Sequence, residues 1–220
     1  MNEGPAPNDP YQTSPTIVAV KQAFDDRSKA DKKAEFRNIV YPTTTRWDIA
    51  NPVINRTITG DVQEGAANLH KEIRSITASS PCATFSLVGY SEGAWAIGYW
   101  LWASAYRNDT KSVKDIALLG DPWWYQDHGR DSHGRRIVSM GLARRFGLAL
   151  LGPPWPAQNT PYLVMSLCNN SDPICGEGYA NTPATQIAAA LTIGGIDSPH
   201  LHYKDNGAAK YAGEFLADHA

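Results

Sequence analysis

Short apolar runs alternate along this chain with longer segments whose apolar residues recur at helical spacing. Residues 83–88, 113–119 and 162–167 are short apolar runs of strand length. The residues from 92 to about 106 follow the first run with an Ala-rich amphipathic pattern that predicts a helix. Apolar residues also recur at helical spacing in four further ranges, 16–26, 61–77, 182–192 and 208–219. The chain therefore predicts strands and helices in alternation.

Alternating strands and helices of these lengths predict a parallel sheet with helices on both faces, a three-layer α/β/α sandwich. We expect one more strand at 36–41, which Pro42 ends. Residues 1–15 are rich in Pro, Asn and Gly and are expected to form a loop, and residues 121–160 are expected to form a long irregular insert. A length of 220 residues fits a single domain, residues 1–220, with a substantial core.

The junction between the first apolar run and its helix reads Gly89-Tyr90-Ser91-Glu92-Gly93. A G-x-S-x-G pattern between a strand and a helix is typical of the nucleophile elbow of serine hydrolases. The turn is sharp, so the residues two before and two after the serine must be small, and glycines occupy both places. The alternative is a Gly-rich turn whose serine has no chemical role. The flanks favour the elbow, with Ser91 near backbone N–H groups that can hold an oxyanion.

A serine nucleophile needs a base, and the base needs a carboxylate to orient it. In this class the chain order is Ser, then Asp or Glu, then His. Asp172 follows one apolar run, and His200 and His202 precede the last helix, so these residues lie on loops at the expected edge of the sheet. Asp121 is a rival carboxylate. An Asp before a proline is typical of a turn, which is our preferred interpretation of Asp121 and the alternative for Asp172.

Charge and cysteine content narrow the class of protein further. The formal net charge is −2, which gives no electrostatic argument for a nucleic-acid or membrane partner. No apolar run reaches membrane-spanning length, and the first residues show no signal-peptide pattern. Cys168 and Cys175 suit a disulfide better than zinc, because no CxxC pair or His cluster supplies further ligands. Two free thiols are the alternative. A disulfide would indicate an oxidising compartment.

Four motifs occur in order along the chain: GYSEGA at 89–94, GDP at 120–122, Cys168-x-x-x-Asp172-x-x-Cys175 and His200-Leu201-His202-Tyr203. Together they resemble the cutinase family of secreted serine esterases. The resemblance spans nearly the whole chain and implies a cutinase-like α/β-hydrolase fold. Four ordered motifs are far more specific than the elbow alone.

The resemblance implies a role for each of several residues. Ser91 would be the nucleophile and His200 the base, since the family's His-Leu-x-Tyr pattern places the catalytic histidine first. Asp172 would be the orienting carboxylate, inside a loop that a Cys168–Cys175 disulfide closes. The backbone N–H of Glu92 would contribute to the oxyanion hole. Neither a metal ion nor an organic cofactor is expected.

Three departures from the family pattern bear on activity. Glu92 stands where the family usually has Gln, and its carboxylate opposes a developing negative charge unless it points into solvent or pairs with a cation. The 121–160 insert is long and lid-like, and its aromatic residues either line a substrate groove or pack under the loop. The family's first strand, with a cysteine to pair with Cys82, has no counterpart. We therefore expect a chain that begins inside the family fold.

These observations predict a serine esterase that hydrolyses carboxylic ester bonds through an acyl-enzyme. Its substrate would be a polyester, an acylated polysaccharide or a lipid ester. One alternative is an acyltransferase or thioesterase with the same triad. Another is a catalytically impaired binding protein of the same fold, which Glu92 and the missing strand would favour. We expect a secreted monomer.

Overall fold

The computed structural model describes residues 14–28, 34–42, 55–103, 109–123, 129–130, 162–169, 172, 174–175 and 199–220. The helices of this part are α1 (Pro15–Arg27), α2 (Asn55–Ser79), α3 (Glu92–Trp102) and α6 (Ala208–His219). The strands are β1 (Phe85–Tyr90), β2 (Val113–Leu119), β3 (Gly129–Arg130) and β4 (Leu163–Leu167). Two short 3-10 turns, η4 (Asp109–Ser112) and η6 (Pro199–Leu201), complete the set.

The strands form one parallel sheet in the order β1-β2-β4-β3. Tyr90 of β1 lies opposite Leu119 of β2, and Leu119 lies opposite Leu167 of β4. The carboxyl ends of these three strands are therefore level with one another, so residues that follow them meet at one edge. The expected parallel α/β architecture is confirmed.

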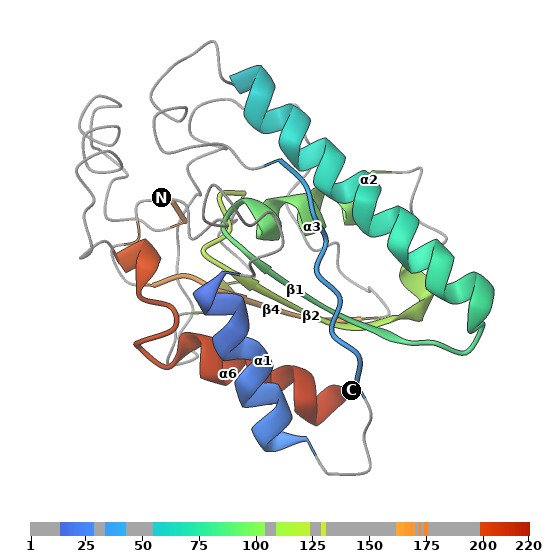
Figure 1. Cartoon of the computed structure of the whole chain (residues 1–220). Coiled ribbons are helices and arrows are strands. Elements are labelled where there is room, and N and C mark those ends of the chain that lie inside the picture. Colours follow the sequence, from blue (N-terminus) through green and yellow to red (C-terminus); the bar gives the residue numbers. More distant parts are fainter. Residues whose placement is uncertain are drawn as a thin grey trace.

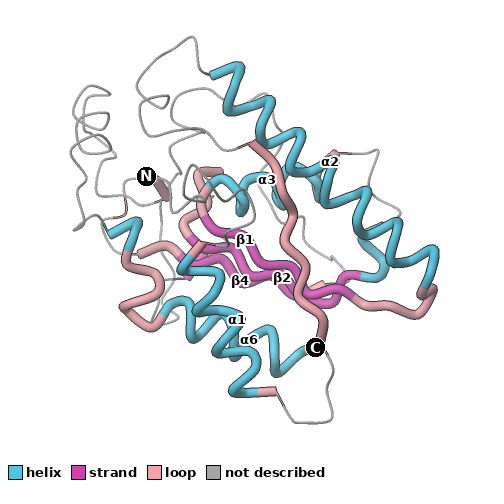
Figure 2. Tube along the Cα trace, viewed as in Figure 1, coloured by secondary structure: helices cyan, strands magenta, loops and turns pink. Residues whose placement is uncertain are grey.

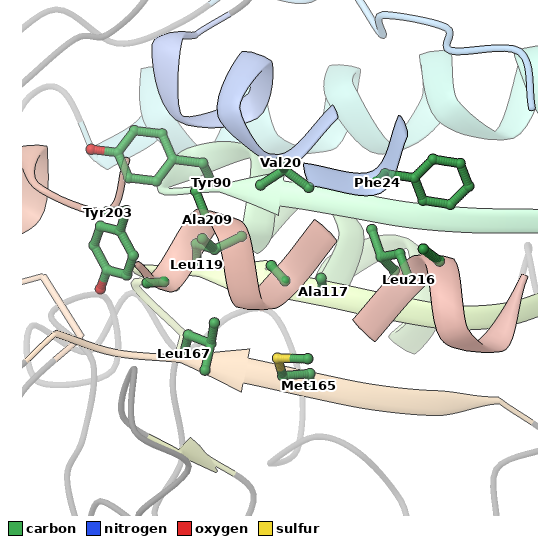
Figure 3. Close-up of a cluster of buried hydrophobic side chains, with 13 residues drawn as sticks. Val20, Phe24, Tyr90, Ala117, Leu119, Met165, Leu167, Tyr203, Ala209 and Leu216 are labelled. Atoms are coloured by element: carbon green, nitrogen blue, oxygen red, sulfur yellow. The ribbon is translucent and has the colours of Figure 1, made fainter. Parts of the chain in front are cut away.

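Helices cover both faces of the sheet, as Figures 1 and 2 show, with α1 and α6 on one side and α2 and α3 on the other. Side chains alternate along β2: Ala117 and Leu119 join the core under α1 and α6, whereas Ile116 and Leu118 join the core under α2 and α3. Figure 3 shows the first of these cores between α1, α6 and the strands. The three layers follow from this two-residue period.

The α1–α6 pair packs closely because α6 carries a glycine at the crossing. A Cβ on Gly213 would lie 2.4 Å from the Val20 carbonyl oxygen and 2.7 Å from the Ala23 Cβ. Ser14 caps α1, since its side chain accepts from the Thr16 N–H at 3.2 Å. The C-terminal helix is thereby fixed against the sheet, and the loop that precedes it, with His200, is anchored at one end.

The prediction of a strand at 36–41 is wrong, because residues 34–42 form no backbone hydrogen-bond ladder with a described strand. This segment passes from one helical layer to the other (Figures 1 and 2). Phe36 packs edge-on against Phe24 of α1, and Asn68 of α2 donates its side-chain amide to the Val40 carbonyl at 2.8 Å. Within the described residues β1 is an outer strand, and side chains rather than backbone pairing hold this segment.

Several expectations fall outside the described residues. These are the helix at 182–192, the first-strand question at the N-terminus, and most of the 121–160 insert. Among the described helices, none combines the length and apolar character that crossing a membrane requires.

Candidate active site

Ser91 lies on the turn between β1 and α3 in a backbone conformation that is unusual for a serine. Its φ is 55° and its ψ −122°, and it is the one non-glycine residue with positive φ in the described part of the chain. Its N–H donates to the Leu119 carbonyl at 2.8 Å, which continues the pairing with β2. A Cβ on Gly89 would lie 2.6 Å from the Ala94 backbone nitrogen, so this position requires glycine. The sharp turn holds the Ser91 hydroxyl out at the sheet edge.

The predicted serine, histidine and aspartate are brought together. Ser91 Oγ lies 2.9 Å from His200 Nε2, and His200 Nδ1 lies 2.8 Å from Asp172 Oδ2. His200 and Asp172 are almost fully buried, at 1% and 0% exposure. His202 instead faces Asp205 at 3.3 Å and is not part of this group.

Two residues at the carboxyl ends of strands, Tyr90 and Gly120, hold His200 in place. Tyr90 donates its hydroxyl to the His200 backbone carbonyl at 2.6 Å, and the two rings stack with centroids 5.0 Å apart. Gly120, directly after β2, has a φ of +60°, and a Cβ there would lie 2.8 Å from His200 Cε1. The imidazole is therefore confined between the ends of β1 and β2.

The Asp172 carboxylate is buried but well supplied with donors. Oδ1 accepts the Ile174 N–H at 2.7 Å, and Oδ2 accepts from His200 and from the Tyr203 hydroxyl at 2.7 Å. The Asp172 N–H donates to the Asn169 carbonyl, so the backbone makes a turn here as well. Asp172 therefore lies in a turn, and its carboxylate also faces His200, so the two interpretations of this residue are compatible.

The disulfide between Cys168 and Cys175 is present and closes the loop that carries Asp172. Both cysteines are fully buried. Cys175 Sγ lies 3.2 Å from Asp172 Oδ2. The cross-link therefore restrains the loop immediately around the buried carboxylate, and Cys82 is an exposed free thiol.

Asp121, the rival carboxylate, does not join the group. Its Oδ1 accepts the Trp123 N–H at 2.8 Å, which is the turn expected of an Asp before proline. Burial raises the pKa of Asp121 to about 7, and the Trp123 N–H opposes this by stabilising the charged form. A second buried carboxyl group thus lies next to Gly120 at the end of β2.

Glu92 is the first residue of α3 and directly follows Ser91. Its backbone N–H lies in the first helical turn and therefore has no carbonyl acceptor within the helix. Tyr41 reaches this turn from the 34–42 segment, and its hydroxyl would lie 3.1 Å from a Cβ on Gly93. Burial, and then the charges of Glu92 and Asp61, raise the pKa of Tyr41. The phenol therefore stays protonated beside the elbow.

Sequence reasoning missed three residues that position this group. Tyr90 and Tyr203 occur in the quoted motifs, but no pattern in the sequence assigns their hydroxyls a partner. In the sequence, Gly120 stands out only as part of a Gly-Asp-Pro turn. A glycine between a strand and an Asp-Pro pair was the one available signal that a neighbouring side chain comes close.

A parallel sheet covered on both faces, with a serine on a strand-to-helix turn and a histidine and an aspartate from later loops, is the arrangement of an α/β hydrolase. The chain belongs to the cutinase family, because the family model described as Cutinase matches residues 12–219. It is accordingly a carboxylic ester hydrolase. A search of curated protein sequences finds no significant match.

Solved structures share the fold at low sequence identity. A cutinase-like protein from Cryptococcus sp. is 21% identical, with a TM-score of 0.60 over 96% of this chain and 88% of that one. The catalytic core domain of acetyl xylan esterase from Trichoderma reesei is 15% identical, with a TM-score of 0.54 over 91% of each chain. Lysin B from Mycobacteriophage D29 is 15% identical, with a TM-score of 0.54 over 98% of this chain and 85% of that one.

Proposed function

We propose that this protein is a serine esterase that works through an acyl-enzyme, with Ser91 as nucleophile, His200 as base and Asp172 as the orienting carboxylate. The observation that carries the proposal is the unbroken line of two hydrogen bonds from Ser91 Oγ through both ring nitrogens of His200 to Asp172. A weak nucleophile is activated in this way by an adjacent base that a third group orients.

The reaction has two halves. Ser91 Oγ attacks the ester carbonyl carbon while His200 Nε2 takes the hydroxyl proton, and His200 then gives this proton to the departing alcohol. Water attacks the acyl group on Ser91, His200 takes a proton from the water, and the acid leaves as Ser91 regains its proton. Asp172 keeps a proton on His200 Nδ1 throughout, so that Nε2 is free to accept.

The backbone N–H of Glu92 is the oxyanion donor in this proposal. It lies in the first turn of α3, where the helix dipole also favours negative charge. The Glu92 carboxylate adds an opposing charge next to this position, so we expect slower acylation than a neutral side chain at position 92 would allow.

We propose that the substrate is a polyester, an acylated polysaccharide or a lipid ester, and that the enzyme acts outside the cell. The Cys168–Cys175 disulfide supports an oxidising compartment, because disulfides persist there and are rare in the cytosol. Membership of the cutinase family supports the ester substrate.

The test is hydrolysis of p-nitrophenyl esters from acetate to palmitate by the wild type and by Ser91→Ala. We expect the variant to lose about 10⁴-fold or more in kcat, because the nucleophile is absent. A fluorophosphonate probe should label the wild type at Ser91 and leave the variant unlabelled. Equal rates for the two proteins would overturn the proposal. Transfer of the acyl group to an added alcohol in preference to water would favour an acyltransferase.

A further inference from the structure

Three groups donate hydrogen bonds to the Asp172 carboxylate, and only one of them is His200. The Ile174 N–H holds Oδ1, while the Tyr203 hydroxyl and His200 Nδ1 share Oδ2 at 2.7 and 2.8 Å. An ionised carboxylate only accepts hydrogen bonds, so Tyr203 is the donor in this contact. With both oxygens engaged, the plane of the carboxylate cannot rotate without breaking a bond to a fully buried charge.

Two further contacts fix the orientation of Tyr203. Its oxygen accepts the Asn169 N–H at 2.9 Å, and its ring packs against Tyr90 with centroids 5.7 Å apart. Figure 3 shows the Tyr90 and Tyr203 hydroxyls at the same end of the apolar cluster. The phenol thus has a single orientation, with its proton directed at Asp172.

The contacts continue to the start of α6. Asn206 donates its side-chain amide to Asn169 Oδ1 at 2.6 Å, and Asn206 Oδ1 accepts the Ala208 N–H at 3.0 Å. The same short stretch of chain supplies His200 and Tyr203, and both reach one oxygen of Asp172. His200 and Tyr203 therefore lie on one short loop that is anchored to α6, and both of them bind Asp172.

We propose that Tyr203 is a positioning residue of this site: its hydroxyl fixes the rotation of the Asp172 carboxylate and, through it, the place of the His200 ring. The inference rests on the proposed function, in which His200 and Asp172 serve Ser91. Burial, together with the Asp172 charge, raises the pKa of Tyr203, which keeps the proton on the phenol as a donor requires.

The first experiment compares Tyr203→Phe with the wild type. A hydrogen bond to a buried charge is lost, so we expect kcat per active site to fall by about 10- to 100-fold while KM changes by less than about twofold. Active sites are counted with the fluorophosphonate probe, so that misfolded protein does not enter the rate. Tyr211→Phe is the matched control, since Tyr211 is an exposed tyrosine of α6, and it should keep wild-type kcat.

A second measurement separates positioning from general structural support. We expect the His200 Nδ1–H proton, which faces Asp172 Oδ2 at 2.8 Å, to give a downfield resonance in the proton NMR spectrum. We expect Tyr203→Phe to move it further downfield, because Asp172 Oδ2 then has no competing donor. Replacing Tyr203 with 3-fluorotyrosine, which keeps the hydroxyl, should restore both the rate and the resonance.

The outcomes are distinct. If Tyr203→Phe turns over like the wild type, or if its resonance does not move, the positioning role is wrong while the proposed function stands. If Ser91→Ala keeps full activity, the proposed function is wrong and the positioning role has no reaction to serve. A fall in kcat that 3-fluorotyrosine reverses, with the shifted resonance, supports the inference.

Discussion

The carboxyl edge of the sheet and the 34–42 segment are built in opposite ways. At the edge, Asp172 and His200 are buried and tied to neighbours by short hydrogen bonds. The 34–42 segment packs through apolar side chains such as Phe36 and Ile39, and Asn68 donates its side-chain amide to the Val40 carbonyl. One region buries charge, and the other buries hydrocarbon.

The difference separates activity from stability. Burying charged groups costs free energy that hydrogen bonds only partly recover, whereas burying hydrocarbon is favourable. We therefore expect substitutions at the carboxyl edge to change turnover, and in one case to raise stability. Substitution of Phe36, which lies on the 34–42 segment away from the elbow, should lower stability and leave turnover intact.

The largest expected effect is at Asp121. Its pKa rises from 3.8 to about 7 on folding, so between these values the folded state binds more protons than the unfolded state. Raising the pH through this window therefore lowers the free energy of unfolding, by an amount of order 4 kcal/mol at full ionisation. Asp121→Asn does not ionise and should escape this loss. Urea denaturation of both proteins from pH 4 to pH 8 measures the difference.

The comparison at each pH cancels the titration of groups that the two proteins share. Asn keeps the oxygen that accepts the Trp123 N–H, so the turn is retained. Parallel stability curves for the wild type and Asp121→Asn would contradict the expectation that the carboxyl edge buries charge at a cost.

A smaller effect is expected at Gly120. A methyl group there would lie 2.8 Å from His200 Cε1 and would also strain a backbone with φ of +60°. Displacing the imidazole by a fraction of an ångström should lower kcat/KM of Gly120→Ala by about 100-fold. Ester hydrolysis per labelled active site measures this.

Gly60→Ala is the matched control, because a Cβ at this position of α2 meets nothing within 4 Å. It should keep full activity and gain about 0.5–1 kcal/mol in stability from the better helix former. Wild-type activity in Gly120→Ala would show that the His200 ring has room to move.

The smallest expected effect is on the 34–42 segment. Phe36→Ala removes a half-buried ring that packs against Phe24 with centroids 5.5 Å apart. The free energy of unfolding should fall by about 1–2 kcal/mol, which is less than for a fully buried phenylalanine. Turnover per labelled site should not change. Val40→Ala, at an exposed position of the same segment, should stay within about 0.5 kcal/mol of the wild type. A loss of turnover in Phe36→Ala would break the comparison.

The elements best predicted from the sequence are those whose pattern and partners agree. The predicted strand at 113–119 and helix at 208–219 have the observed bounds. Residues 36–41 carry a similar apolar pattern, but a strand is defined by hydrogen bonds to a neighbour. No described strand pairs with them, and their side chains pack against helices instead. Local pattern carries no information about that neighbour.

The candidate site was predictable to the extent that chain order determines it. Serine, aspartate and histidine were expected at the carboxyl ends of strands, and the structure brings Ser91, Asp172 and His200 within hydrogen-bonding distance. The groups around them depend on tertiary distances instead. The contact between Tyr203 and Asp172 joins residues 31 positions apart, and that between Tyr90 and His200 joins residues 110 apart. No spacing rule in a sequence encodes either.

Residues 200–203 meet the same carboxylate oxygen twice, once through His200 and once through Tyr203. An insertion or deletion between these two residues would carry one of them away from Asp172, whatever amino acids were used. Engineering of this enzyme by loop-length variation should therefore leave this tetrapeptide at its native length. Changes of length are better placed in connections that do not have to bring two side chains to the same atom.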